Sequence, residues 1–254
     1  MVGIERASPA LATAVGIDLA WSPRHLSGLA IADVSEERIS VRELSLIGDL
    51  ARIEGAIGSQ SPPLTIAIDA PTIVPNQSGM RPAERELQRR FGAMSAGPYP
   101  ANRALLGSPN GRRPRGEELV GSLRTRFGAR EVGIPPTRHN GFYVMEVFPA
   151  PAIVTLFQLD SSLRYKKKPR RGWGDCRAEL SRYIELLRSL QEPRLELPDI
   201  SVAGERGTAF KALEDRVDAI LCAYLAGLGW LFGTDRLEMV GSLQDGYIIV
   251  PKRT

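Results

Sequence analysis

Cysteine, histidine and long apolar runs are all scarce in this chain of 254 residues. The two cysteines, Cys176 and Cys222, have neither the spacing of a disulfide framework nor a histidine placed as in a zinc site. The first residues include Glu5 and no sustained apolar run, so they do not predict a secretory signal peptide. The most apolar stretch, residues 219–233, is about fifteen residues long, short of the ~20 that a membrane span needs. We therefore expect a cytoplasmic protein with free thiols and no membrane association.

The net charge of +4 hides an uneven distribution of charge along the chain. Residues 103–138 contain eight arginines against three glutamates, a local net of +5, and residues 164–177 carry a local net of +6. The remainder therefore has a net charge of −7. Segregated positive charge steers polyanions toward a protein, although two solvated loops explain the same pattern. Composition thus permits a nucleic-acid partner without requiring one.

Short apolar runs predict the order β-β-β-α-β for the first seventy residues. Runs at 15–20, 28–34 and 39–46 are joined by links too short for a parallel crossover, which favours an antiparallel meander. Apolar residues at helical spacing over 50–57 predict a short helix. A fourth strand is expected at 65–70, ended by Pro71.

The middle of the chain differs in composition from the segments on either side of it. Residues 72–140 are rich in proline and glycine and contain two predicted helices, 82–91 and 116–127. We interpret this segment as an insertion or lid in a single domain spanning 1–254, whose core comprises about 14–71 and 141–251. The second part of the core should contain a strand at 142–148, a helix capped by Asp175, a long helix from Thr208 to about 232, and a closing strand at 247–250.

Five carboxylates fall where core elements usually carry apolar residues. Asp18 lies in the first predicted strand, Asp69 ends the fourth, and Glu146 lies in the strand after the insertion. Asp215 and Asp218 are three residues apart and so share one face of the long helix. Burying a carboxylate costs several kcal/mol unless it is paired, hydrogen-bonded or bound to a metal. An oxygen-only donor set without histidine or cysteine favours Mg²⁺ or Mn²⁺ over zinc.

The same helical face continues through small residues. Ala219, Cys222 and Ala226 follow the two aspartates, and such a stripe lets a helix approach a sheet closely. The alternative for Asp215 is a solvated ion pair with Lys211, one turn earlier.

The other acids also have structural alternatives. Asp18 could be satisfied by backbone hydrogen bonds, and the Asp-Ala-Pro context of Asp69 suits a turn. Glu146 could pair with a basic residue of 164–177.

Several short motifs together resemble a known family. In order, they are VGIDLAW (15–21), IAIDAP (66–71), EVFP (146–149), Tyr165-Lys166 and DRVDA (215–219). This series resembles domain-of-unknown-function family 429, a group predicted to be nucleases of the RNase H-like fold, over nearly the whole chain (15–251). The Asp-x-x-Asp-Ala helix is also similar to the last motif of RuvC-type resolvases.

The resemblance implies an α/β protein with an RNase H-like mixed sheet of five strands, flanked by helices, and a large insertion after the fourth strand. Strands one and four would be parallel neighbours, bringing Asp18 and Asp69 together, and the closing helix would deliver Asp218. These three acids match the family's metal ligands. Asp215 would lie beside them, and Glu146 matches a family motif.

The expected activity is hydrolysis of phosphodiester bonds in nucleic acid by a two-metal mechanism. Asp18, on the central strand, is the expected bridging ligand. His139 could assist proton transfer, although a histidine in a polar loop is more often simply exposed.

The basic segments supply candidate contacts to the substrate backbone, with no sign of sequence reading. Lys166 is the strongest candidate; others are Lys167, Lys168, Arg170, Arg171, Arg112, Arg113 and Arg115, with Arg81 and Glu84 weaker. Tyr165 and Trp173 are interleaved with these cations and could stack on bases.

Two other functions remain open at this point. An actin-like ATPase or phosphotransferase shares the first-strand aspartate but needs a glycine-rich phosphate turn after it, and here no glycine follows before Gly28. A non-catalytic module that binds nucleic acid or protein could also use an RNase H-like scaffold. The sequence does not indicate an oligomeric state.

Overall fold

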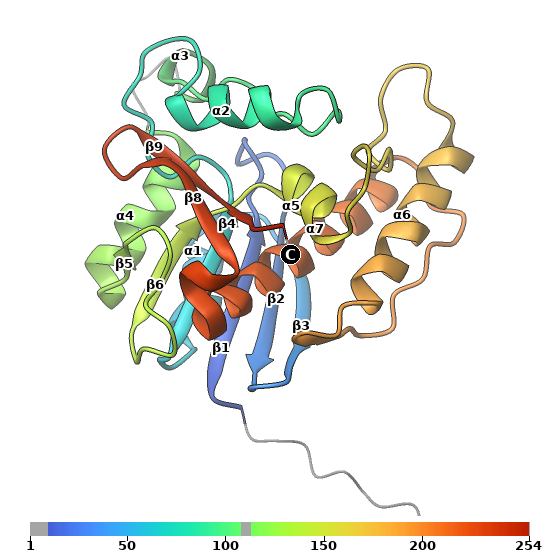
Figure 1. The fold of residues 1–254 in the computed structure, drawn as a ribbon. Coiled ribbons are helices and arrows are strands. Elements are labelled where there is room, and N and C mark those ends of the chain that lie inside the picture. The colour runs from blue at the N-terminus through green and yellow to red at the C-terminus, as the bar shows by residue number, and fades with distance from the viewer. Residues whose placement is uncertain (1–9, 108–112, 254) are drawn as a thin grey trace, which may run out of the picture.

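The computed structural model describes residues 10–107 and 113–253, and in this part of the chain seven strands form one mixed sheet (Figure 1). Their order across the sheet is β5-β6-β4-β1-β2-β3-β7. The strands are β1 (Ala12–Asp18), β2 (Ser27–Val34), β3 (Arg38–Ile47), β4 (Leu64–Asp69), β5 (Arg130–Glu131), β6 (Phe142–Glu146) and β7 (Arg194–Glu196).

The pairing of the strands confirms the predicted meander. β1, β2 and β3 pair antiparallel, whereas β4 lies parallel to β1, and β6 lies parallel to β4. The prediction of five strands is wrong, because β5 and β7 extend the sheet at its two edges. These strands have only two and three residues, too few to show a period of two in the sequence.

Helices cover both faces of the sheet (Figure 1). They are α1 (Leu50–Gly58), α2 (Pro82–Phe91), α3 (Arg103–Leu106), α4 (Arg115–Phe127), α5 (Pro149–Leu156), α6 (Trp173–Arg188) and α7 (Gly207–Phe232), followed by a 3-10 turn (Gly233–Asp235).

Two predicted helix starts are slightly misplaced. Asp175 lies inside the first turn of α6, which is capped by Gly172, and Thr208 lies inside α7, which follows Arg206. An aspartate in a first turn is still favourable, because it faces the positive end of the helix dipole.

The two faces of the sheet carry side chains of different size. Toward α1 and α4 the strands present large β-branched and leucine residues such as Val15 and Ile17. Toward α7 they present small residues such as Ala14, Ala30 and Ala67. Because successive side chains of a strand point to opposite faces of the sheet, one short apolar strand can contribute large residues to one face and small residues to the other.

Small residues on both sides let α7 lie directly on the sheet, as its stripe of small residues predicted. A Cβ atom added to Gly16 of β1 would lie 2.0 Å from the carbonyl oxygen of Ala219. One added to Gly28 of β2 would lie 2.0 Å from the carbonyl oxygen of Asp215. The backbone of α7 is therefore held against β1 and β2, which fixes the height of its aspartates relative to the strand ends.

The apolar window of α7 is somewhat longer than predicted. The segment Gly207–Asp235 contains 18 consecutive residues with a mean hydropathy of 1.5, so by length and composition it could cross a membrane. However, 89% of that apolar window is buried inside the protein. A helix that is apolar on all sides is expected where both the sheet and other helices cover it.

A separate hairpin packs outside the main sheet. β8 (Leu237–Ser242) and β9 (Gly246–Pro251) pair antiparallel, and the predicted Asp245-Gly246 turn joins them. α2 lies across this hairpin (Figure 1), and the two share a small apolar core that includes Leu87 and Ile248. The first helix of the insertion is thus anchored to the C-terminal end of the chain.

Candidate active site

Two aspartates meet at the carboxyl ends of neighbouring strands. Asp18 ends β1 and Asp69 ends β4, and the parallel register pairs these two residues directly. The predicted convergence of Asp18 and Asp69 is therefore confirmed. Glu146 ends β6, where it pairs with Ile68, so the third strand end brings another carboxylate to the same edge.

The close packing of α7 brings a third aspartate beneath these strand ends. Asp218 is completely buried, and its Oδ1 accepts a hydrogen bond of 2.7 Å from the hydroxyl of Tyr165. The ammonium of Lys166 lies 2.8 Å from the Oδ2 of Asp218. Adjacent residues of one loop thus hold both oxygens of this carboxylate.

Burial and charge repulsion raise the pKa values of two of these carboxyl groups, those of Asp18 and Asp69. Burial raises the pKa of Asp18 well above its usual range, and Asp218 and Asp69 add repulsion. Burial also raises the pKa of Asp69, to about 7. The positive charge of Lys166 opposes both shifts.

Lys166 is the cation about which the three acids converge. Burial lowers the pKa of its ammonium, but the three carboxylates outweigh burial and raise that pKa well above its usual range. The Lys166 side chain is nevertheless 44% exposed, because it lines a cavity that opens above the acids. We define the acid cluster as Asp18, Asp69 and Asp218, with Lys166 as its counter-ion.

Asp215 has the ion-pair partner that the sequence allowed as an alternative, but its carboxylate is buried rather than solvated. It forms an ion pair with Lys211, four residues earlier on the same face of α7. It also lines the cavity, so it lies beside the acid cluster with a cation of its own.

The acid cluster has the type of donor atom that divalent ions prefer, but in this structure its carboxylates are paired with a lysine instead. Its donors are hard carboxylate oxygens, and the Oδ2 of Asp18 is buried without a hydrogen-bond partner among the described residues. Within residues 10–107 and 113–253, no group of three or more His, Cys, Asp and Glu side chains is placed to hold a metal ion. Lys166 is the residue that would have to withdraw for an ion to enter.

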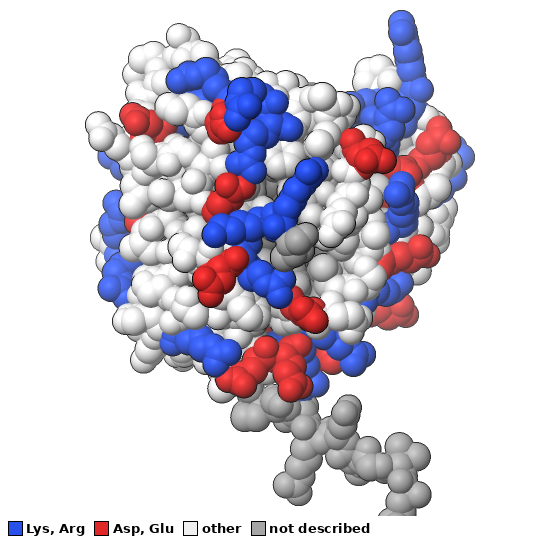
Figure 2. Space-filling view, in the orientation of Figure 1, with Lys and Arg blue, Asp and Glu red and all other residues white. Residues whose placement is uncertain are grey.

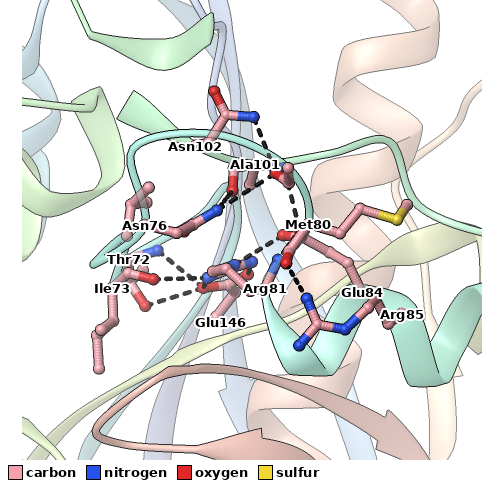
Figure 3. Close-up of polar contacts among 12 residues, drawn as sticks. Thr72, Ile73, Asn76, Met80, Arg81, Glu84, Arg85, Ala101, Asn102 and Glu146 are labelled. Carbon is pink, nitrogen blue, oxygen red and sulfur yellow. Dashed lines mark hydrogen bonds and ion pairs between the residues drawn. The ribbon is translucent and has the colours of Figure 1, made fainter. Parts of the chain in front are cut away.

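Glu146 is held by an arginine from the insertion rather than by residues 164–177. Arg81, which caps α2, donates to both oxygens of Glu146 at 2.5 and 3.0 Å (Figure 3). The backbone N–H of Thr72 donates to the same carboxylate at 2.8 Å. The proposed pairing of Glu146 with the second basic segment is therefore wrong; its partner lies 65 residues away in sequence.

Arg81 and Glu84 form the rest of this buried network. The Nε atom of Arg81 donates to Glu84 at 2.7 Å, and the backbone N–H of Ala101 donates to Glu84 at 3.0 Å (Figure 3). Arg81 and Glu84 are each 1% exposed, and neither lines the cavity. In this arrangement the two residues that we considered as substrate contacts instead join α2 to the end of β6.

The cavity above the acid cluster has a volume of about 720 Å³, within the range of ligand-binding pockets. Its walls come from the β1–β2 loop, the segment after α2, the start of α5, the loop 162–171 and the first turns of α7. Three carboxylates line it, from Asp18, Asp69 and Asp215. Six cationic side chains also line it: Arg24, Arg164, Lys166, Lys168, Arg171 and Lys211.

Six cations against three carboxylates give the cavity lining an excess of positive charge. On the face drawn in Figure 2, acidic and basic side chains are interspersed. The cavity is therefore a place where an anionic ligand meets more cations than carboxylates.

Several predicted substrate contacts lie away from the cavity. Lys167 and Arg170 do not line it, and the ammonium of Lys167 lies 5.4 Å from the ring centre of Trp173. Trp173 packs edge-on against Phe210 and does not line the cavity. Tyr165 does line it, but its side chain is buried and its hydroxyl donates to Asp218, so its ring is not placed to stack on a base.

The remaining polar candidates are also placed elsewhere. His139 precedes β6, whereas the acids lie at the carboxyl ends of the strands, so His139 lies toward the opposite end of the sheet. Its Nδ1 atom is 2.7 Å from the hydroxyl oxygen of Tyr143. Arg113 is exposed, Arg115 lines a smaller hollow, and Arg112 lies outside the described residues.

Two exposed aromatic residues at the cavity were not predicted from the sequence as site residues. Trp21 and Tyr99 both line it and are 62% and 70% exposed. Trp21 comes three residues after Asp18, and this closeness to a candidate metal ligand could have indicated that it lies at the site. Tyr99 lies in a Gly-Pro-Tyr-Pro segment that carries no comparable signal.

A comparison with known families gives a match over most of the chain. The model of the family described as "Protein of unknown function (DUF429)" matches residues 16–231, so the chain belongs to the DUF429 family. No curated protein and no solved structure shows significant similarity to the chain.

Proposed function

We propose that this DUF429 protein is a divalent-metal-dependent hydrolase of phosphodiester bonds in nucleic acid. One observation carries the proposal: Asp18, Asp69 and Asp218 converge under a cavity whose lining contains six cationic side chains and three carboxylates. Acidic clusters of this kind hold cations, and the surrounding positive charge favours phosphate.

The strand order supports an RNase H-like fold for this hydrolase. An antiparallel meander is followed by a strand parallel to its first member, and the acids lie at the ends of these two strands. The last long helix then supplies the third acid. This arrangement agrees with what the family resemblance implies.

The protein's own residues have defined roles in this proposal. Asp18, Asp69 and Asp218 would hold one or two Mg²⁺ or Mn²⁺ ions, and Tyr165 fixes the orientation of Asp218. Bound divalent ions would polarise the phosphate and supply hydroxide near neutral pH. Lys166 keeps the acids neutralised in the ion-free protein and, once withdrawn from Asp218, can contact a phosphate oxygen from the cavity wall.

The test is cleavage of labelled single-stranded, duplex, hybrid and branched nucleic acids in Mg²⁺ or Mn²⁺. We expect cleavage by the native chain and losses of more than about a hundredfold in each of Asp18→Asn, Asp69→Asn and Asp218→Asn. The three losses should be similar, because groups that act as a unit are not additive. Asp175→Asn, an exposed position in the first turn of α6, is the matched control and should cleave normally. Cleavage that survives Asp18→Asn would refute the proposal.

Metal binding gives a second measurement that does not depend on turnover. Mn²⁺ should raise the melting temperature of the native chain, because an ion that binds only the folded state stabilises it. Asp18→Asn and Asp218→Asn should remove this shift, and Asp175→Asn should keep it.

One observation favours a non-catalytic binding module instead. Lys166 already neutralises the acid cluster, as a permanent structural ion pair would. That alternative predicts no thermal shift with Mn²⁺ and no cleavage, with oligonucleotide binding that Asp18→Asn leaves unchanged.

A further inference from the structure

Exposed aromatic side chains line the cavity. Of the eight exposed large hydrophobic side chains among residues 10–107 and 113–253, three line this cavity: Trp21, Leu26 and Tyr99. Trp21 and Tyr99 are the two aromatic residues among the eight. They come from different segments, the β1–β2 loop and the loop after α2, so the cavity has two independent aromatic surfaces.

A cationic side chain lies next to the ring of Tyr99, and another lines the same cavity as Trp21. The ammonium of Lys168 is 5.8 Å from the ring centre of Tyr99 and 3.4 Å from its hydroxyl. Arg24 follows Trp21 by three residues and lines the same cavity. Aromatic rings interleaved with cations are typical of sites that bind single-stranded nucleic acid, where the cations follow the backbone and the rings stack on bases.

We propose that the cavity selects nucleic acid with unpaired bases, which stack on Trp21 and Tyr99. A base inside a duplex has both faces covered by its neighbours and offers none to a protein ring. A blunt duplex would therefore reach the cations but leave both rings in contact with water. A single strand satisfies the cations and the rings together.

This inference deepens the proposed function, on which it rests for the position of the reacting phosphate at the acid cluster. Its own evidence is separate, because the rings and their cations do not belong to that cluster. The two can therefore be tested independently.

The experiment measures binding without cleavage, in EDTA, by fluorescence anisotropy of end-labelled DNA and RNA twelve-mers. Each sequence is offered as a single strand and as a blunt duplex. The native full-length chain is compared with Trp21→Leu, Tyr99→Leu, Trp21→Phe and, as a control, Leu243→Ser. Leu243 is 43% exposed in the β8–β9 turn and does not line the cavity. Melting temperatures verify that each variant is folded.

We expect single strands to bind more tightly than blunt duplexes. Trp21→Leu and Tyr99→Leu should each weaken single-strand binding by roughly five- to a hundredfold, as for the loss of one stacked base. Their effect on duplex binding should be under about twofold, Trp21→Phe should retain most of the affinity, and Leu243→Ser should behave as the native chain. The DNA and RNA arms distinguish the two sources of single strands.

Three results would overturn the inference. The first is equal or tighter binding of the blunt duplex, and the second is single-strand binding that neither leucine substitution changes. The third is binding of polyglutamate but of no oligonucleotide, which would assign the rings to an acidic protein partner. If the expected binding pattern appears but Mn²⁺ produces no cleavage, the inference stands and the hydrolase proposal fails.

Discussion

Removing the Arg81 guanidinium would leave two carboxylates buried without their main cation. Glu146 and Glu84 are 2% and 1% exposed, and both depend on Arg81 (Figure 3). Breaking a buried ion pair by removing one partner costs about 3–5 kcal/mol, because the remaining charge is uncompensated. We therefore expect Arg81→Ala to lower the free energy of unfolding by that amount and the melting temperature by roughly 6–20 °C.

The geometry also predicts an intermediate variant. Arg81 contacts both oxygens of Glu146 with a planar fork, which a lysine cannot reproduce. Arg81→Lys should keep the charge and lose about 1.5–3 kcal/mol, the value of a charged hydrogen bond. Arg89→Ala is the matched control, since Arg89 forms a solvent-exposed ion pair with Glu86 on the same helix and its loss should leave the free energy of unfolding nearly unchanged.

Urea denaturation followed by circular dichroism measures these differences, and a double-mutant cycle isolates the pair. Arg81→Ala combined with Glu146→Gln should lose less than the sum of the single losses, with a coupling of about 1–3 kcal/mol. The reasoning fails if Arg81→Ala changes stability by no more than Arg89→Ala does. It also fails if the folded Arg81→Lys protein loses oligonucleotide binding at native stability, because Arg81 would then be a substrate contact.

Two further predictions concern packing and pH. Gly16→Ala should destabilise the protein by about 1–3 kcal/mol or more in urea denaturation, because its Cβ would lie 2.0 Å from the backbone of α7. Gly55→Ala, in α1 with open space around it, should instead stabilise by about 0.4–1 kcal/mol, and a similar loss at both positions would contradict the packing argument. Burial raises the pKa of Glu214 to about 7, so the folded state binds more protons than the unfolded state between about pH 4 and 7. The stability that protonated Glu214 contributes is therefore lost as pH rises through this range. Glu214→Gln should make the melting temperature fall less steeply between pH 5 and 8 in EDTA. An unchanged slope would contradict the raised pKa of Glu214.

Much of the fold could be predicted because its signals are local. The runs that form β1 to β4, and the small stripe on α7, follow from residues close together in sequence. The edge strands β5 and β7 could not be predicted, because two or three residues are too few to show the alternation of a strand. Such short segments become strands only by pairing with the edge of a sheet that is already formed. The role of Gly16 could not be predicted either, because it depends on the close contact between its strand and the backbone of α7 at Ala219, which are far apart in sequence.

The acid positions could be predicted from the cost of burying a carboxylate, but the partners of the acids could not. Asp18 and Asp69 are brought together by parallel pairing, which the family resemblance implied and the order of short apolar runs alone did not. The partner of Glu146 is supplied by a helix 65 residues away, and no local pattern marks that contact. Sequence therefore identified charged core positions without distinguishing a structural ion pair from a site open to ligand.

The type of cation that pairs with each acid distinguishes the structural ion pair from the site that is open to the cavity. Glu146 and Asp218 are both buried acids at core positions, yet Arg81 saturates one of them with a rigid fork and is itself 1% exposed. Asp218 is instead paired with Lys166, a point charge on a flexible stem that is 44% exposed at a cavity. An arginine fork sealed on all sides has no route away from its carboxylate, whereas a lysine at a cavity wall has space to move. In the proposed function, the acid cluster with Lys166 is therefore the part of this charged core that would act on a ligand. The Arg81 network is the part that joins α2 to the end of β6.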